Sequence, residues 1–549
     1  MNLRALIPVI LMAASLGAQP GQIAIPRIDQ MPDLPTPFNV RDWKQVTLDY
    51  DNFVYNPALT GDYLPLLYKE DSGPNYPELP VFGLPSYVGS NNPKGGEAIN
   101  VLPSIIGATL AGIDKSNQNG NNWVLWSQNY FNRANGQNIY LNAPKTSSGN
   151  DWWYDVMPNV YFYQLYDLYG PMGHADEQFT AVADAFAGSA RALGGSDTPW
   201  QPAFFNHRAF DFATGKPNSE SVPEPEAAGT YAWLLYHAYK VTGEKRYLEA
   251  AEWCIEFLDQ WPNNPSYELQ LPYGAYTAAK MNAELHTHYD LEKMINWIFD
   301  RGALRGWGTI VGRWNGFDVS GLIGEANDNG NDYAFLMNGL HQAAALAPLV
   351  RYDKRYARAI GKWILNLANA TRLYYPGFLP ASLQDGAEWS AQYDPMKVVG
   401  HEALREVWNG ASPFSTGDAV RGGWAATNLA LYGSSSIGYL GGILAKTNVD
   451  GILRIDVRKT DFYSDGYPMY LYFNPYDTPK SVVVTLPDTS VRVYDLLRES
   501  FLSEGAASSL EVTIPAGEAT LVALLPASGT MEQVENRMVL NDLVVDYLP

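Results

Sequence analysis

Apolar residues recur with the helical period over most of the chain, and the helices that they predict come in pairs joined by short turns. Three stretches match one another: LYDLYGPMGHADEQFTAVADAF at 165–186, AYKVTGEKRYLEAAEWCIEF at 238–257 and LVRYDKRYARAIGKWIL at 349–365. A repeated helix–turn–helix unit of this kind indicates a repeat architecture. The pattern predicts helical hairpins at roughly 97–133, 155–192, 227–260, 275–300, 333–371 and 397–444.

The two helices of a hairpin differ in composition. The stretch EAAGTYAWLLYHAYKVTG at 226–243 is rich in Ala, Gly and Tyr, which suits inner helices that approach one another closely. The next stretch, EKRYLEAAEWCIEFLDQW at 244–261, keeps one polar face and suits an outer ring. We therefore expect a mainly α fold, with a helical toroid over residues 95–446.

The hydrophobic period changes to two after about residue 450. The segments LRIDVRK, MYLYFN, SVVVTLP, VRVYDLL, LEVTIP and ATLVALL predict six short strands, and so a small antiparallel β-sandwich at 450–527, followed by a tail at 528–549. Residues 21–94, before the helices, are rich in Pro and Gly and keep no sustained period, so we expect them to be irregular.

The first 20 residues resemble a signal peptide, with Arg4 ahead of a short apolar stretch that ends in small residues. We therefore expect a secreted or periplasmic protein, and no later apolar run is long enough to predict membrane insertion. The formal net charge of -21 disfavours nucleic acid as a partner. Cys254, the only cysteine, lies in an apolar helical run and is expected to be a buried thiol.

Paired helices with turns such as VTGEKRYLEAA, followed by a small β-sandwich, resemble the six-hairpin glycosidase superfamily. The resemblance covers about residues 97–526 and implies an (α/α)6 toroid that acts on a carbohydrate substrate. Aromatic residues make up 13% of the chain, and aromatic faces stack on sugar rings. We expect a glycoside hydrolase that uses two carboxyl groups and needs no metal or other cofactor.

Acidic residues recur just before the predicted inner helices, where the mouth of a toroid would lie. Capping alone favours acids at helix starts, but Glu224 and Glu226 flank a proline and cannot both cap. We expect Glu226 as the acid and Asp332 as the base, because each stands at the start of an inner helix in a separate hairpin. The other candidates for a catalytic role are Asp155, Glu224, Asp328 and Asp418.

Polar and aromatic residues in loops are candidates for binding sugar; they are Trp152, Trp153, His207, Arg208, His286, His288, Trp314 and Arg421. The histidines also allow a second hypothesis, a polysaccharide lyase that removes a proton beside a uronate through His or Tyr. A third hypothesis is a glycan-binding protein without catalytic activity.

Overall fold

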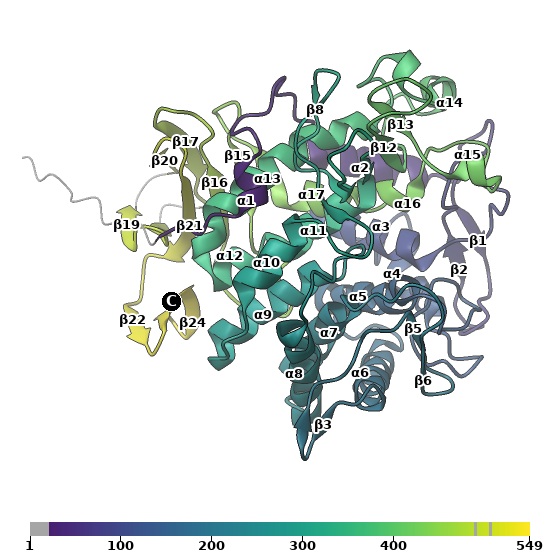
Figure 1. Cartoon of the computed structure of the whole chain (residues 1–549), viewed down its shortest axis with the longest axis horizontal. Coiled ribbons are helices and arrows are strands. Elements are labelled where there is room, and N and C mark those ends of the chain that lie inside the picture. The colour runs from purple at the N-terminus through teal and green to yellow at the C-terminus, as the bar shows by residue number, and fades with distance from the viewer. Residues whose placement is uncertain (1–20, 488–490, 504, 506–507, 549) are drawn as a thin grey trace, which may run out of the picture.

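The computed structural model describes residues 21–487, 491–503, 505 and 508–548, so the predicted signal peptide lies outside the described residues. Six helices contact one another in chain order, and the last of them also contacts the first. We call them the inner helices (Figure 1): α3 (Ala98–Ala111), α5 (Trp152–Tyr169), α7 (Ala227–Thr242), α9 (Leu271–Leu285), α11 (Leu336–Leu346) and α17 (Ile437–Ile443).

Glycines let neighbouring inner helices approach closely. A Cβ atom on Gly229 of α7 would lie 2.5 Å from the carbonyl oxygen of Gln270, at the start of α9. A Cβ atom on Gly107 of α3 would lie 2.8 Å from the Cα atom of Gly438 in α17. The small residues that set the predicted inner helices apart are therefore required by their packing.

Other helices pack outside or between the inner ones, and their apolar faces turn toward them. They are α2 (Trp43–Val54), α4 (Trp123–Trp126), α6 (Ala175–Ala192), α8 (Lys245–Gln260), α10 (Leu291–Phe299), α12 (Leu349–Tyr352) and α13 (Ala357–Ala370). The buried Cys254 of α8 is one of these packing residues, as expected. None of the helices in the described part of the chain is long and apolar enough to cross a membrane.

The prediction that residues 21–94 are irregular is wrong in part. Helix α2 lies in this segment, and Asp42 caps it by accepting the backbone N–H of Gln45. Its sequence, WKQVTLDYDNFV, buries Trp43, Val46, Tyr50 and Val54 on one face, so the helical period was present but short. The segment also contains α1 (Pro26–Asp29) and the paired strands β1 (Tyr68–Glu70) and β2 (Val81–Gly83).

The predicted hairpin at 397–444 is only partly helical, with the short helices α15 (Ala419–Gly422) and α16 (Leu431–Ser434) before α17. A sheet that the sequence did not reveal lies beside α11, because its strands of three residues are too short to show a period. Its strands, in spatial order, are β13 (Phe414–Thr416), β12 (Ala403–Arg405), β11 (Tyr333–Phe335), β10 (Ile323–Glu325) and β7 (Trp307–Thr309).

The chain ends in a sheet-rich region, as predicted (Figure 1). One sheet has the order β14 (Leu444–Lys446), β15 (Leu453–Asp456), β16 (Met469–Phe473), β21 (Ala519–Pro526), β18 (Val491–Asp495) and β19 (Ser500–Ser503). A hydrophobic cluster joins it to the pair β17 (Lys480–Thr485) and β20 (Ser509–Ile514), and α13 contacts β16 and β21. The tail forms β22 (Met531–Val534), β23 (Arg537–Leu540) and β24 (Leu543–Tyr547).

Candidate active site

A cavity of about 630 Å³ lies at the N-terminal ends of several inner helices. Glu97 stands at the N-cap of α3, Tyr154 in the first turn of α5 and Phe335 at the N-cap of α11, while Glu268 comes two residues before the N-cap of α9. The free N–H groups of helix starts favour negative charge nearby. We call this space the mouth cavity; its other lining residues include Ser86, Tyr87, Asn91, Arg305, Trp307, Asn338, Glu402, Asp418, Trp424 and Tyr432.

Two segments far apart in the sequence form one wall of the mouth cavity. The backbone N–H of Asn91 donates to the carbonyl of Trp424 at 2.9 Å, and its side chain donates to the carbonyl of Gly423 at 2.7 Å. An isolated antiparallel bridge pairs Tyr87 with Ala430 nearby. The N-terminal segment therefore contributes to the site as well as to the packing.

Glu268 lines the mouth cavity, and among the described residues only one of its carboxylate oxygens accepts a hydrogen bond. Its Oε1 atom accepts a hydrogen bond from Arg305 Nη1 at 2.8 Å, whereas Oε2 has no hydrogen-bond partner among the described residues. The side chain is 23% exposed. Burial raises the pKa of Glu268 to about 7; the cation of Arg305 opposes the rise, and the negative charges of Asp151 and Glu226 add to it. A carboxyl group with this pKa can hold a proton near neutral pH.

Asp418 also lines the mouth cavity, and arginine side chains bind it as well. Its Oδ1 atom accepts hydrogen bonds from Arg405 Nη2 at 2.9 Å and from Arg421 Nη2 at 2.7 Å. Its backbone N–H donates to Glu402 Oε2 at 2.8 Å. The Oδ2 atom has no hydrogen-bond partner in the part of the chain that the structure describes, and the side chain is partly exposed. Two guanidinium groups thus stabilise a carboxylate that still has a free oxygen.

Glu97 and Glu402 also line the mouth cavity, but both oxygens of each are already engaged. Glu97 accepts hydrogen bonds from Ser86 Oγ and, at 2.7 Å, from Asn142 Nδ2. Glu402 Oε1 accepts a hydrogen bond from the Tyr87 hydroxyl at 2.9 Å. Burial raises the pKa of both carboxyl groups. Their hydrogen bonds fit a role in shaping the walls.

The two residues predicted as the catalytic pair lie elsewhere. Glu226 is buried and does not line the mouth cavity; its oxygens accept the backbone N–H groups of Glu268 at 2.7 Å and of Leu271 at 3.3 Å. Asp332 Oδ1 accepts the backbone N–H groups of Asn327 at 2.7 Å and of Asp328 at 2.9 Å, which closes the turn before β11. Both carboxyl groups therefore have the contacts of backbone caps.

Of the four other catalytic candidates, one lines the mouth cavity and three do not. Asp418 lines the mouth cavity, whereas Asp328 forms an ion pair with Arg27 at 2.8 Å away from it. Asp155 is buried in the first turn of α5, and burial raises its pKa to about 8. Glu224 is buried as well. Its pKa is raised to about 10, mainly by burial and, to a smaller extent, by the negative charges of Asp151 and Glu268.

Three tryptophans predicted to stack on sugar are in the core. Trp152 is 0% exposed, Trp153 2% and Trp314 5%, and none of them lines the mouth cavity. Trp424 is 49% exposed and does line it. It closes the sequence GDAVRGGW, in which Asp418 and Arg421 were identified as candidates, but Trp424 itself was not among the predicted residues.

The candidate histidines and Arg208 do not line the mouth cavity. Arg208 bridges Asp151 and Glu224, and His207 Nδ1 lies 2.8 Å from Ser219 Oγ. His286 and His288 follow the C-terminal end of α9 and line a separate cavity of about 540 Å³. In the described residues, no histidine lines the mouth cavity.

No protein-family model matches the chain, and no curated protein matches it. A GH127 β-arabinofuranosidase structure is similar at 11% identity and a TM-score of 0.34, over 94% of this chain and 85% of that chain. A GH127 β-L-arabinofuranosidase from Geobacillus stearothermophilus T6 matches at 11% identity and 0.32, over 92% and 85%. A further glycoside hydrolase matches at 8% identity and 0.39, over 97% and 84%. These TM-scores are too low to indicate a function for this chain.

Proposed function

We propose that the protein is a secreted glycoside hydrolase, that its inner and outer helices form an (α/α)6 toroid, and that the mouth cavity is its active site. One observation carries the proposal. Glu268 and Asp418 line the same cavity, and arginine side chains bind each of them through a single oxygen. Each keeps its other oxygen free of partners among the described residues.

Glycoside hydrolysis needs two carboxyl groups in opposite protonation states. Glu268, with its raised pKa, is the acid that donates a proton to the glycosidic oxygen as the bond to the anomeric carbon breaks. Asp418, with its two arginine partners, is the carboxylate that activates water or attacks that carbon. Glu402 is a positioning residue, because it accepts the backbone N–H of Asp418.

The remaining lining residues suit a neutral sugar ring. Trp424 offers an exposed aromatic face on which such a ring can stack. Asn338 and Asn92 place amide groups in the same space, where they can bond to hydroxyl groups. Several acidic side chains line the cavity while Arg305 is bound to Glu268, so a uronate would meet repulsion.

The lyase hypothesis requires a base whose pKa is close to neutral. The tyrosines that line the mouth cavity include Tyr87, Tyr154 and Tyr432, and burial raises the pKa of each above its ordinary value. Neighbouring carboxyl groups, among them Glu402 beside Tyr87 and Glu97 beside Tyr154, add to the rise. These groups are poor bases, which favours hydrolysis over elimination.

The proposal is tested by incubating the mature protein with a panel of neutral oligosaccharides and aryl glycosides and measuring new reducing ends. On an oligosaccharide that is cleaved, Glu268→Gln and Asp418→Asn should each lower kcat by about 10³-fold or more. Glu325→Gln is the matched control, because Glu325 binds the Nε atom of the same Arg305 at 2.8 Å without lining the cavity. Its rate should stay within a few-fold of the wild type.

Three outcomes would contradict the proposal. Saccharide binding without turnover would support the glycan-binding hypothesis, and unsaturated products absorbing in the ultraviolet from a uronate polymer would support the lyase. Near-normal turnover by both the Glu268 and the Asp418 variants would place the chemistry elsewhere.

A further inference from the structure

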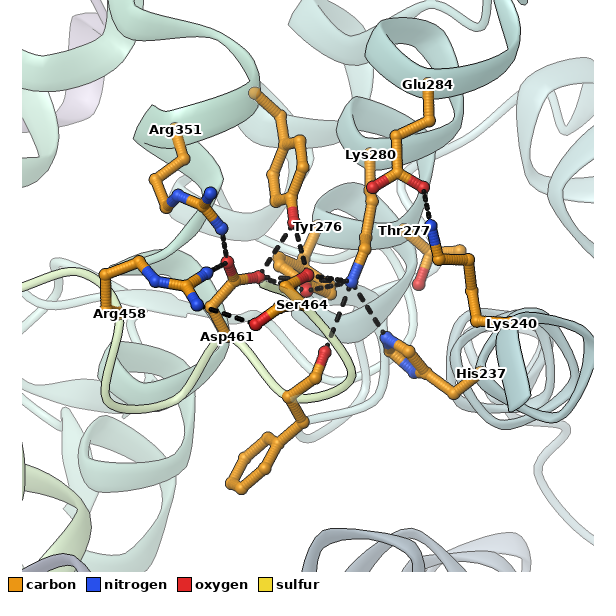
Figure 2. Close-up of polar contacts among 12 residues, drawn as sticks. His237, Lys240, Tyr276, Thr277, Lys280, Glu284, Arg351, Arg458, Asp461 and Ser464 are labelled. Atoms are coloured by element: carbon orange, nitrogen blue, oxygen red, sulfur yellow. Dashed lines mark hydrogen bonds and ion pairs between the residues drawn. The ribbon is translucent and has the colours of Figure 1, made fainter. Parts of the chain in front are cut away.

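A group of polar residues lies at the opposite ends of the inner helices from the mouth cavity (Figure 2). Asp461, in the segment that joins β15 to β16, pairs with Arg351 and, at 2.7 Å, with Arg458. The buried Lys280 of α9 donates to Ser464 Oγ, in the same segment, at 2.7 Å. These groups bind one another and join the sheet-rich region to the helices, so packing accounts for them. Exposed aromatic residues on the outer helix α8 have no such explanation.

Two large aromatic side chains lie exposed against α8. Trp200 is 42% exposed and Phe204 is 49% exposed. The ring centroid of Trp200 lies 6.1 Å from that of Trp253. The ring centroid of Phe204 lies 5.8 Å from that of Phe257 and 6.3 Å from that of Trp261. We call Trp200, Phe204 and the partly exposed Trp261 the aromatic track. Exposed aromatic side chains gathered in this way mark a binding surface.

The two most exposed rings of the aromatic track are held in place. Trp200 Nε1 donates to Glu256 Oε2, on α8, at 2.7 Å. The backbone N–H of Phe204 donates to the carbonyl of Leu193, at the end of α6, at 2.8 Å. Side chains that are already ordered lose little conformational entropy when a ligand binds. The aromatic track is therefore a preformed surface.

The aromatic track follows α8 toward the mouth side of the helical region. Trp253, Phe257 and Trp261 are spaced by four residues, which places them about 6 Å apart along the helix axis. Helix α8 follows α7 after a short turn at Gly243 and packs along it, so α8 ends where α7 begins (Figure 1). Trp261 is the C-cap of α8, and the mouth cavity lies at the N-terminal ends of the inner helices.

Partly exposed side chains connect the aromatic track with the mouth cavity. The ring of His207 lies 5.5 Å from that of Phe204, measured between centroids. The guanidinium carbon of Arg208, the next residue, lies 6.0 Å from the ring centroid of Tyr267. That of Arg305 lies 5.3 Å from the same ring, and Arg305 lines the mouth cavity. The track and the cavity are thus joined through neighbouring side chains.

The size of the aromatic track fits a saccharide better than a protein partner. A stable protein interface buries about 800 Å² on each partner. The exposed parts of Trp200 and Phe204 together amount to roughly 200 Å², because aromatic side chains bury about 150–250 Å² each when fully covered. This area is too small for a stable protein interface, whereas aromatic faces suit the stacking of sugar rings.

Polar groups beside the aromatic track favour an uncharged sugar. His207 Nδ1 lies 2.8 Å from Ser219 Oγ, whereas Nε2 has no hydrogen-bond partner among the described residues. Burial lowers the pKa of His207, which favours the neutral ring, and a neutral ring nitrogen can bond to a sugar hydroxyl. The carboxylate of Glu256, which binds Trp200, would repel an acidic sugar.

We propose that the aromatic track binds a neutral polysaccharide, one end of which enters the mouth cavity. Sugar rings stack on Trp200 and Phe204, and His207 bonds to a hydroxyl group of the same chain. The substrate of the glycoside hydrolase is then a polymer, because only a long saccharide reaches both the track and the cavity. This last step rests on the proposed function, whereas binding at the track needs no turnover.

The test measures the mobility of the mature full-length protein in native gels that each contain one soluble polysaccharide. The neutral polymers are arabinan, arabinoxylan, glucomannan and starch, and polygalacturonate is the charged comparison. At least one neutral polymer should retard the wild type, and the double variant Trp200→Ala/Phe204→Ala should bind it about 10-fold more weakly or worse. Tyr63→Ala is the matched control, because Tyr63 is 51% exposed but lies outside both the track and the cavity lining, and it should keep the wild-type affinity.

Hydroxyl-radical footprinting of the wild type serves if the double variant does not fold. The polymer that retards the protein should lower the oxidation of Trp200 and Phe204 but not that of Tyr63. Retardation without new reducing ends would mean that the proposed function is wrong while the track still binds glycan. No retardation by any neutral polymer, stronger retardation by polygalacturonate, full affinity in the double variant, or unchanged oxidation at Trp200 and Phe204 would each overturn the proposal.

Discussion

The carboxylate of the buried Glu226 accepts the backbone N–H of Glu268 at 2.7 Å. The side chain of one glutamate therefore holds the backbone of the other in place. The second oxygen of Glu226 accepts the N–H of Leu271 at the start of α9. Burial raises the pKa of Glu226 to about 6, although several backbone donors oppose the rise. Glu226 thus fixes the position of Glu268 and places negative charge behind it.

Glu226→Gln should shift the pH profile as well as the rate. Its amide group turns a donor toward one of the two backbone N–H groups, which should cost about 1–3 kcal/mol of unfolding free energy. Because the negative charge of Glu226 raises the pKa of Glu268, removing it should move the basic limb of kcat/KM to lower pH. Denaturant unfolding and a pH–rate profile measure the two effects. A lower rate with an unmoved basic limb would mean that Glu226 only stabilises the fold.

Arg305→Met should shift the same limb in the opposite direction. Arg305 donates to Glu268 Oε1 at 2.8 Å and holds the pKa of that carboxyl down. Without the cation the pKa of Glu268 rises, so the acid should stay protonated, and active, to higher pH. The pH dependence of kcat/KM for the variant and the wild type, measured on one substrate, decides the point. A shift of the limb to lower pH would contradict the assignment of Glu268 as the acid.

Trp424→Ala should weaken substrate binding without unfolding the protein. Its side chain is exposed and lines the mouth cavity, so we expect KM to rise about 10-fold while the unfolding free energy changes by less than about 0.5 kcal/mol. Trp152→Ala should instead cost about 3–5 kcal/mol of unfolding free energy, because that side chain is in the core. Val420, equally exposed but outside the cavity lining, is the control position. An unchanged KM in Trp424→Ala would rule out the stacking role.

Asp155→Asn should stabilise the protein at alkaline pH. Burial raises the pKa of Asp155 to about 8 in the folded state, well above that of an unfolded aspartate near 3.9. The folded state therefore binds the extra proton, and the wild type loses stability as pH rises between these values. The amide stays neutral and can still accept the N–H of Gly149, which Asp155 Oδ2 accepts at 2.8 Å. Thermal midpoints at pH 5 and pH 8 test this, and a larger gain at pH 5 would contradict it.

The sequence predicted helices and strands where the hydrophobic period extended over enough residues. The hairpin predicted at 227–260 corresponds to α7 and α8, and the strands predicted after residue 450 coincide with β15, β16, β17, β18, β20 and β21. The strands β7, β10, β11, β12 and β13 were missed, because three residues cannot establish a period. The pairing of β11 with β12 also joins segments far apart in the chain, which no local pattern contains.

The sequence predicted a site at the starts of the inner helices, and the cavity that we propose as the active site lies at those ends. The predicted hairpin at 275–300 begins four residues after the true start of α9 at Leu271, so Glu268, in the turn PSYELQ before it, was not among the predicted residues. Asp418 was identified because GDAVRGGW precedes the last predicted inner helix, where acidic residues recur. Whether an acid at a helix start caps the backbone or faces a cavity depends on tertiary contacts, as Glu226 and Glu268 show.

The measurement that tests the central claim most directly compares leaving groups in the Glu268→Gln variant. An acid is needed to protonate a poor leaving group, whereas dinitrophenolate departs without a proton. For a sugar that the wild type cleaves, the variant should lose about 10³-fold or more in kcat/KM on an alkyl glycoside and less than about 10-fold on the dinitrophenyl glycoside. Equal losses on both substrates, or no loss on either, would contradict the assignment of Glu268 as the acid of a glycoside hydrolase.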